Sequence, residues 1–321
     1  MAKTAVIIGA RGQDGRLLQE LLCSKRYRLA CIERGATRVE GLEWKEAVDI
    51  TRATDVFHLI QEFRPDEVYH LAAIHHSSQE SAREDLELFR ISYEVNFFSL
   101  LHFLEAIRLY SRKTRLFYAS SSHVFGNPPS EVQSEETPFS PQSVYAMTKV
   151  DGLLACRQYR RAHQVFASVG ILYNHESKYR QEKFLSKKVI RAVSEIKRGS
   201  LEELALGNLD TAVDWGYAPD YVEAMHAILA APEAGEFIVA TGVKHTAREF
   251  VQAAFREAGL DWKQWVSEEN PQVMGRGSQA RIGNASKLMS TTGWMPKTSF
   301  LEMIRILLEQ DSVPTSLSEG W

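Results

Sequence analysis

The sequence contains few cysteines, no long hydrophobic run and no excess of basic residues. Its three cysteines, Cys23, Cys31 and Cys156, are widely spaced, so neither a disulfide framework nor a CxxC metal site is predicted. Stretches without formal charge, such as 116–130 and 162–175, fall short of the roughly 20 apolar residues of a membrane span. Lysine plus arginine number 38 against 41 aspartates plus glutamates, which argues against a nucleic-acid-binding surface. The N-terminal sequence does not resemble a signal peptide, so we expect a cytoplasmic protein without membrane contact.

Strand-like and helix-like segments alternate along the first half of the 321-residue chain. The predicted strands are 5–8, 28–32, 67–71, 115–118 and 165–172, and the predicted helices include 13–24 and 86–109. This alternation predicts an α/β fold with a doubly wound parallel sheet of the Rossmann type. Residues 1–173 are expected to form a dinucleotide-binding domain with returning segments near 208–242. Residues 174–321 are expected to form mainly a smaller α/β substrate-binding portion.

Three glycines follow the first predicted strand and open a helix. Glycines at such a turn let the backbone approach a pyrophosphate, whose charge then meets the helix N-terminus. A dinucleotide is therefore predicted to bind at Gly9, Arg11, Gly12, Gln13, Asp14 and Gly15.

The residues after the second predicted strand bear on the choice between NAD and NADP. Glu33 ends that strand, where an acid accepts from a ribose 2′-hydroxyl and repels a 2′-phosphate. Arg34 and Arg11 could instead pair with a 2′-phosphate. NADP is the prediction, with NAD as the alternative.

A tyrosine and a lysine four residues apart, Tyr145 and Lys149, follow a serine run that includes Ser121. This spacing places both side chains on one helix face. A nearby ammonium is expected to lower the tyrosine pKa from about 10 toward neutrality. Such a tyrosine can take a proton from a sugar hydroxyl while a nicotinamide takes the hydride, and Ser121 can hydrogen-bond the same hydroxyl.

These elements together resemble the extended short-chain dehydrogenase/reductase family. The GxxGxxG spacing matches that family, and further matching positions follow in the same order: Asp49, Ile50, His70, Leu71, Ala72, Ala73 and Asn96. The resemblance implies that Asp49 and Ile50 contact the adenine and that Leu71 to Ala73 lie over the cofactor phosphates.

Within that family, the second half is most similar to the GDP-mannose 4,6-dehydratases. The motifs that carry this resemblance are 170–177 (GILYNHES), 206–210 (LGNLD), 214–225 (DWGYAPDYVEAM), 240–242 (ATG) and 293–296 (GWMP). The resemblance implies that the substrate-binding residues are Asn174, Ser186, Lys188, Leu206, Gly207, Asn208 and Arg276. Of these, Asn174 would contact the sugar or diphosphate, and Ser186 and Lys188 would lie near the guanine.

Three positions depart from the dehydratase pattern. His123 stands where the family has a glutamate that removes the C5 proton. Val213 stands where the family has an arginine that contacts a phosphate. The family's Arg-Pro-x-Glu stretch is absent, and Arg276 or Arg281 would take the place of the arginine of that stretch. A neutral imidazole is a competent base near pH 7, and extended backbone from Ser121 to His123 would put both on one side. The other interpretation is that His123 is a packed or surface residue.

The sequence thus predicts a nucleotide-sugar 4,6-dehydratase that acts on a GDP-sugar such as GDP-mannose. The alternatives are a related C4 dehydrogenase, ketoreductase or epimerase without dehydration, and a non-catalytic dinucleotide-sensing protein. By analogy with the family, a homodimer or homotetramer is expected. No metal site is predicted, because the adjacent side chains of His75 and His76 point apart.

Overall fold

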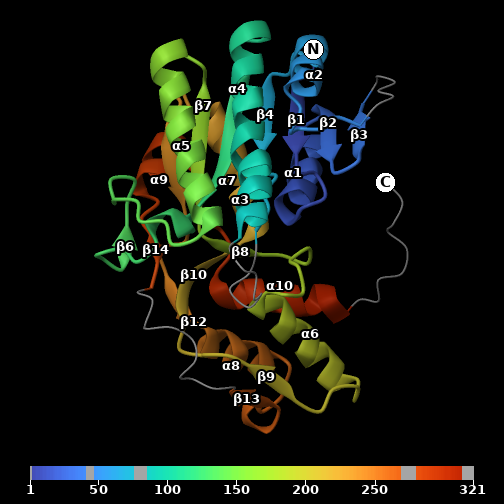
Figure 1. The fold of residues 1–321 in the computed structure, drawn as a ribbon. Helices are drawn as coiled ribbons and strands as arrows, with labels where there is room; N and C mark the ends of the chain where they lie inside the picture. The colour runs from blue at the N-terminus through green and yellow to red at the C-terminus, as the bar shows by residue number, and fades with distance from the viewer. Residues whose placement is uncertain (1, 41–46, 76–84, 269–279, 313–321) are drawn as a thin grey trace.

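A seven-stranded sheet forms the centre of the larger part of the molecule (Figure 1). The computed structural model describes residues 2–40, 47–75, 85–268 and 280–312. The strand order is β11-β7-β5-β4-β1-β2-β3, and every pair is parallel except β2 with β3. The strands are β1 (Thr4–Ile8), β2 (Arg28–Glu33), β3 (Ala36–Val39), β4 (Glu67–His70), β5 (Arg115–Ser121), β7 (Ala167–Leu172) and β11 (Glu236–Val239). The predicted doubly wound parallel sheet is confirmed.

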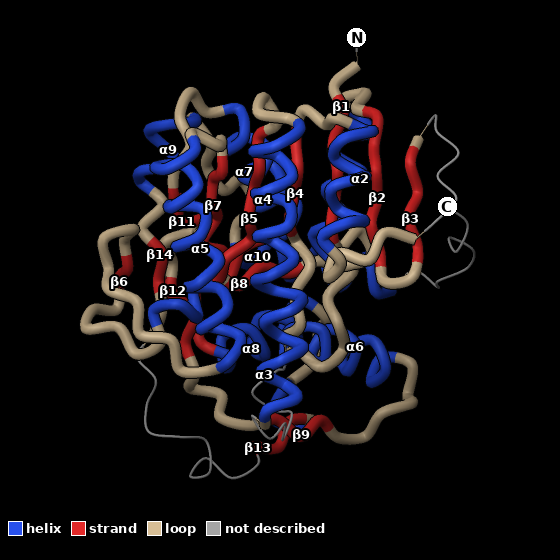
Figure 2. Tube along the Cα trace, turned by 45° about the horizontal axis from the view of Figure 1, so that its top comes forward, coloured by secondary structure: helices blue, strands red, loops and turns tan. Residues whose placement is uncertain are grey.

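Helices cover both faces of this sheet. One apolar cluster joins the strands to α2 (Ala53–Phe63), α4 (Ser99–Tyr110) and α5 (Val144–His163), which lie side by side in Figure 2. The cluster on the other face includes α1 (Gln13–Ser24), α7 (Ala218–Ala230) and α9 (Ser286–Thr292). Segments from late in the chain therefore complete the larger part of the molecule. Strand β11 joins the sheet, and helices α7 and α9 join the helical layer of α1.

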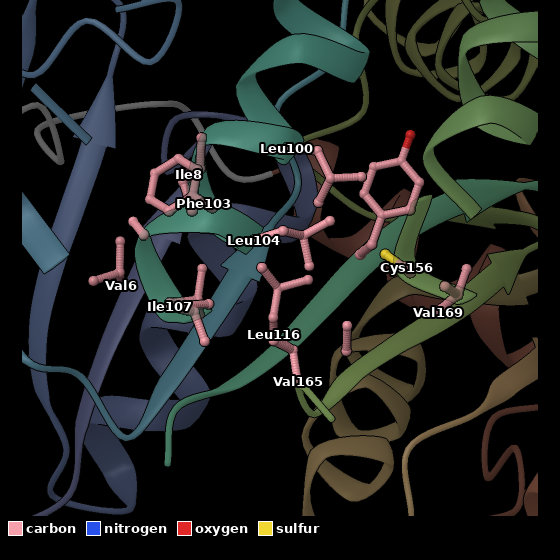
Figure 3. Packing of buried hydrophobic residues seen from close by; sticks show 14 of the residues in the cluster. Val6, Ile8, Leu100, Phe103, Leu104, Ile107, Leu116, Cys156, Val165 and Val169 are labelled. Carbon is pink, nitrogen blue, oxygen red and sulfur yellow. The ribbon is translucent and has the colours of Figure 1, made fainter. Parts of the chain in front are cut away.

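The core beneath α4 and α5 is closely packed (Figure 3). Leu100, Phe103 and Leu104 of α4 meet Leu116 of β5, and all four side chains are fully buried. Cys156 of α5 lies in the same cluster. Burial of a side chain of this size contributes about 1.5–3 kcal/mol. This packing fixes α5, which carries Tyr145 and Lys149, against the end of β5.

A smaller portion lies below the carboxyl ends of the parallel strands (Figure 1). Its apolar cluster is built mainly from α6 (Leu185–Lys197), α8 (Ala247–Glu257) and α10 (Phe300–Ser312). Short strands accompany them: β8 (Asn174–Glu176), β10 (Ala212–Tyr217) and β12 (Lys244–Thr246) in one sheet, β9 (Leu204–Leu206) with β13 (Val266–Glu268), and β6 (Val132–Gln133) with β14 (Ile282–Gly283). The 3₁₀ turns are η2 (Ser122–Phe125) and η3 (Trp262–Gln264).

The long helix predicted over 86–109 is interrupted. It consists of α3 (Leu86–Tyr93), the π-helical turn η1 (Glu94–Phe98) and α4. The wider turn contains Asn96, whose side chain accepts from Ile74 N at 2.7 Å and donates to Thr148 Oγ1 at 3.1 Å. A π-turn is frequent at functional sites, and here it ties the loop after β4 to α5.

No helix among the described residues is long and apolar enough to cross a membrane. Over the same residues, no group of three or more histidine, cysteine, aspartate or glutamate side chains is arranged to hold a metal ion.

Candidate active site

The glycine turn joins β1 to α1 at the carboxyl end of the sheet. Gly9 has φ +88°, and a Cβ there would come within 2.8 Å of Ala72 N in the loop after β4. A Cβ on Gly15 would collide with the carbonyl oxygen of Gly9 and lie 2.8 Å from Ala10 Cα. Only glycine allows this close approach of strand, helix and neighbouring loop. The turn therefore has the shape that the sequence predicts for a pyrophosphate at the α1 N-terminus.

The side chains of Gln13 and Asp14 point toward the chain after β7. Gln13 Nε2 donates to His175 O at 3.0 Å, and Asp14 Oδ1 lies 3.0 Å from His175 Nε2. Burial alone would raise the pKa of Asp14, but the charge and hydrogen bond of His175 lower it below its ordinary value. The sequence did not indicate this pair, because its members are far apart in the chain. The contact between Asp14 and His175 links the glycine turn to the segment that begins with Asn174.

The end of β2 carries a cluster of charges. Glu33 lies 2.5 Å from Arg11 Nε and 3.0 Å from Arg38 Nη2, whereas Arg34 is exposed. Arg38 was not singled out by the sequence, because the antiparallel strand β3 that brings it back was not predicted. The carboxylate of Glu33 therefore pairs with the guanidinium groups of both Arg11 and Arg38.

The other predicted cofactor contacts lie in two loops at the same end of the sheet. Leu71 N donates to Ile8 O at 3.0 Å, which extends the β1–β4 pairing and holds Ala72 and Ala73 beside the glycine turn. Asp49 accepts from Thr51 N at 2.9 Å and Thr51 Oγ1 at 2.7 Å, and these bonds lower its pKa. Ile50 is half-buried and its carbonyl contacts His102 Nδ1 at 3.1 Å.

Ser121, Tyr145 and Lys149 converge where β5 ends against α5. Ser143 caps α5 by accepting from Ala146 N, so that Tyr145 lies in the first turn. The side chains of Ser121 and Tyr145 are hydrogen-bonded. Lys149 is buried, donates to Ala119 O at 2.7 Å and places Nζ 5.6 Å from the centroid of the Tyr145 ring. The structure brings these three side chains together, and their catalytic roles remain predictions.

The expected effect of Lys149 on Tyr145 is wrong. Burial raises the pKa of Tyr145 to about 12, although the hydrogen bond from Ser121 and the charge of Arg180 act in the opposite direction. Burial also lowers the pKa of Lys149 to about 7, so that its charge is not fully present at neutral pH. A buried, half-charged amine cannot hold a phenolate, and the tyrosine remains a phenol.

His123 reaches the same place by a different backbone path from the one predicted. β5 ends at Ser121, and His123 lies in the 3₁₀ turn η2, with its N–H 3.3 Å from Ser121 Oγ. The extended geometry expected for 121–123 is therefore wrong. The imidazole nevertheless faces the tyrosine, with 5.9 Å between its ring centroid and that of Tyr145. Burial, followed by the charges of Arg281 and His75, lowers the pKa of His123 to about 3.

A pocket of about 320 Å³ opens beside these side chains. Its lining comes from the loop after β4, the start of α3, η2 and the start of α5, together with Arg281. The lining residues are Ile74, His75, Leu88, Ser92, His123, Gly126, Asn127, Gln142, Ser143, Val144, Tyr145, Ala146 and Arg281. The pocket has the size of a sugar-binding site and combines apolar walls with a few converging polar groups.

Sequence reasoning missed two polar side chains near the tyrosine. The ring of His75 is perpendicular to that of Tyr145, with centroids 4.5 Å apart, and stacks on Phe184. The guanidinium carbon of Arg180 lies 3.6 Å from the centroid of the Phe184 ring, and Arg180 Nε lies 3.1 Å from Glu176 Oε2. His75 comes two residues after Ala73 in the loop that follows β4, which is the signal that could have identified it. Arg180 carries no such local signal.

Those predicted substrate-binding residues that the structure describes lie in the smaller portion and are not among the residues that line the pocket. Asn174 begins β8, directly after the Tyr173 that ends the run from β7. Ser186 is buried and donates to Glu176 Oε2 at 2.6 Å, and Lys188 follows it on α6. Leu206 is buried in the apolar cluster, and Gly207 and Asn208 form the turn after β9. Arg276 lies outside the described residues, so these assignments remain predictions.

The residues at the carboxyl end of the sheet fit a nicotinamide dinucleotide. A Cβ on Gly9 or Gly15 would collide with neighbouring backbone, so only glycines allow the tight turn that a pyrophosphate needs, and Glu33 lies where an adenine ribose would end. Lys149 donates to one carbonyl only in the bonds described, which leaves donors for ribose hydroxyls. The Tyr145 side of the pocket would then hold the nicotinamide together with a sugar.

Comparison with protein families gives one match over almost the whole chain. The family described as GDP-mannose 4,6 dehydratase matches residues 6–307. The GDP-mannose 4,6 dehydratase of Drosophila melanogaster is 34% identical, over 96% of this chain and 86% of the relative. The corresponding protein of Sinorhizobium fredii (strain HH103) is 33% identical, over 96% of both chains.

Two solved structures have the same architecture. The RMD protein of Pseudomonas aeruginosa, complexed with NADPH, has a TM-score of 0.81 at 20% identity, over 97% of this chain and 99% of the other. The UDP-glucose 4-epimerase of Thermus thermophilus, complexed with NAD, has a TM-score of 0.80 at 24% identity, over 97% and 100%. At these identities the similarity establishes the fold.

Proposed function

This chain belongs to the GDP-mannose 4,6 dehydratase family, and we propose that it dehydrates a GDP-linked hexose such as GDP-mannose at C4–C6. The observation that carries the proposal is the pocket in which Tyr145 and His123 face each other beside Ser121 and Lys149. A dinucleotide-sensing protein would need no such pair of proton-transfer groups. The family relationship supports the guanosine diphosphate part of the substrate.

The first step oxidises C4. A nicotinamide held here would supply hydride transfer, from C4 at first and later to C6, where the addition is completed by a proton returning to C5. As the hydride leaves, Tyr145 would take the proton of the C4 hydroxyl while its own phenol proton passes on toward the neutral amine of Lys149, and Ser121 hydrogen-bonds the same oxygen. Lys149 holds this end of α5 against β5 through Ala119 O and offers its remaining N–H groups to the cofactor ribose.

The second step removes water across C5 and C6. Once C4 is a ketone, the C5 proton is acidic enough for a neutral imidazole to take it. His123 is neutral at physiological pH because burial lowers its pKa to about 3. The imidazolium formed by that transfer is a strong acid, which can give the proton to the departing C6 hydroxyl. His123 thus acts first as base and then as acid.

Mass spectrometry of the product with GDP-mannose tests this function. We expect the product to be lighter than the substrate by one water, with no net change in the cofactor. A product lighter by two hydrogens, with reduced cofactor accumulating, would contradict dehydration and indicate a C4 dehydrogenase. An unchanged substrate would contradict the choice of sugar, and the same assay with other GDP-hexoses then identifies the correct one.

For the cofactor we propose NADP, and we expect Glu33 to limit the preference over NAD. The carboxylate lies between Arg11 and Arg38, so that a 2′-phosphate must share these guanidinium groups with it. The Glu33→Gln variant should bind NADP about tenfold more tightly, equivalent to about 1.4 kcal/mol, and NAD less tightly. Titration of both dinucleotides by tryptophan fluorescence measures this. A variant that gains no NADP affinity would contradict a 2′-phosphate at this edge.

We also propose that the chain forms a homodimer or homotetramer in the cytoplasm. Phe98 of η1 and Met147 and Leu154 of α5 are apolar and substantially exposed on the same layer of helices, which supports a contact with a second copy. The three cysteines are free thiols, as expected in a reducing compartment. Light scattering should give at least twice the chain mass, and a monomer would contradict the assembly.

A further inference from the structure

One charged side chain of the pocket takes no part in the proton transfers described above. Arg281 lines the same pocket as the imidazoles of His75 and His123, and its charge acts on His123. The lining contains neither aspartate nor glutamate among the described residues, so its positive charge has no acidic counterpart there. Burial lowers the pKa of Arg281, which reflects the cost of holding a cation in this place. A buried cation of this kind favours the binding of an anion, which either arrives with the substrate or forms during the reaction.

The backbone at Arg281 and at the two residues after it is fixed by pairing with neighbouring strands. Arg281 forms an isolated bridge with Val213 of β10, and the next residues, Ile282 and Gly283, pair with β6. Its Nη1 donates to Gly126 O at 3.1 Å. Gly126 has φ +57°, and a Cβ there would collide with Ser140 O, so only glycine can present its carbonyl in this way. The remaining guanidinium N–H groups are available to the pocket.

The charges that form during dehydration define what Arg281 can stabilise. Loss of the C5 proton leaves an electron pair on the ring, and the C6 oxygen departs with a second pair. A glutamate base becomes neutral when it takes the proton, whereas a histidine base becomes positive. A pocket with a histidine therefore contains no negative group of its own, and a fixed cation beside it is matched by the negative charge of the reacting sugar.

We propose that Arg281 contacts the C6 oxygen of the sugar and stabilises the negative charge that leaves with it. This inference rests on the proposed function. The C5–H bond breaks and its proton goes to His123, the electron pair forms the C5–C6 double bond, and the C6–O bond breaks. The departing oxygen takes the proton back from His123 and leaves as water, so that atoms and charges balance.

The surroundings of His123 agree with this role. Three groups face its imidazole: Arg281, His75 from the loop after β4, and the phenol of Tyr145 on α5. Burial is the largest influence on the pKa of His123, and the charges of Arg281 and His75 lower it further. Removal of Arg281 should therefore raise the pKa of His123 toward its ordinary value.

Two substitutions at Arg281 and one control test the proposal. Arg281→Leu should lower the rate of water loss about 10²–10³-fold, the usual effect of removing one donor to a developing oxyanion. Arg281→Lys should recover part of that rate. The acid limb of the pH–rate profile of Arg281→Leu should move to higher pH, while its affinity for GDP and its single-turnover C4 oxidation stay at wild-type values. Arg305→Leu, which removes an exposed arginine paired with Glu257 on α8, should match the wild type in every assay.

Each other outcome overturns the inference in a recognisable way. If Arg281→Leu binds GDP much more weakly, Arg281 is a ligand of the diphosphate instead. If it loses water at the wild-type rate with an unchanged pH profile, Arg281 has no part in the elimination. If the wild type itself never exchanges its C5 proton with solvent, the proposed dehydration fails, and the inference fails with it for that separate reason. Circular dichroism and dinucleotide affinity show whether each variant is folded.

Discussion

Replacement of Tyr145 by phenylalanine should lower turnover by about two to four orders of magnitude while leaving dinucleotide affinity unchanged, as for the loss of a general acid/base. The phenol hydroxyl is hydrogen-bonded to Ser121 and lies at the wall of the pocket, where it can accept the proton of a sugar hydroxyl. The ring itself contributes packing against His75, and phenylalanine retains that packing. The variant therefore removes the proton acceptor and little else.

Steady-state turnover of GDP-mannose and titration with NADP measure these two effects separately. Tyr159→Phe is a matched control, because it removes a hydroxyl from the same helix at a site that contacts Glu105, away from the pocket. The control should turn over substrate at nearly the wild-type rate. A folded Tyr145→Phe protein with near-normal turnover would exclude this residue from the mechanism.

Burial keeps both Tyr145 and Lys149 largely uncharged. It raises the pKa of Tyr145 to about 12 and lowers that of Lys149 to about 7. Both groups are then mostly neutral at pH 7.5, and as the pH falls below about 7 Lys149 gains its charge. Spectroscopic titration of the protein without cofactor should therefore show no phenolate from Tyr145 below pH 10. An absorbance change at neutral pH that is absent from Tyr145→Phe would contradict this.

Local signals in the sequence were sufficient for the parts of the site that lie in one segment. Gly9 to Gly15 specify strand, turn and helix, and α1 has the predicted bounds of Gln13–Ser24. The spacing of Tyr145 and Lys149 fixes their common helix face, and the β5 end brings Ser121 to them because sequential strands and helices of a parallel sheet are neighbours.

Contacts between distant segments were not predictable in the same way. The Asp14–His175 pair joins residues that are far apart in the sequence. Arg180 acts on Tyr145 from a loop that has no regular periodicity. The π-turn at Asn96 depends on side-chain bonds to Ile74 and Thr148, which only tertiary packing provides. The pKa of Tyr145 was misjudged because pairing with an ammonium can be deduced from spacing, whereas desolvation depends on everything that surrounds the pair.

Replacement of His123 by alanine should abolish exchange of the C5 proton with solvent deuterium, while C4 oxidation persists in a single turnover. Loss of a general base predicts a fall in dehydration by about two to four orders of magnitude. The reason is the position of the imidazole, with its ring centroid 5.9 Å from that of Tyr145 and its charge suppressed by burial and by Arg281. Nuclear magnetic resonance of the sugar in D₂O measures the exchange, and the near-ultraviolet absorbance of the reduced cofactor measures the oxidation.

Two further variants separate a chemical role of His123 from a packing role. His123→Gln keeps a polar side chain of similar size but cannot take a proton, so it should lose C5 exchange as the alanine variant does. His123→Glu places a carboxylate there, as in the dehydratase pattern, and should recover part of the exchange although pairing with Arg281 weakens the base. His102→Gln, on α4 and bonded to Ile50 O, is the control for loss of a histidine and should exchange normally. If His123→Gln dehydrates as the wild type does, the histidine is a packing residue. If the wild type oxidises C4 but exchanges C5 with no GDP-hexose, the chemistry stops at C4, and the fold serves a dehydrogenase, ketoreductase or epimerase.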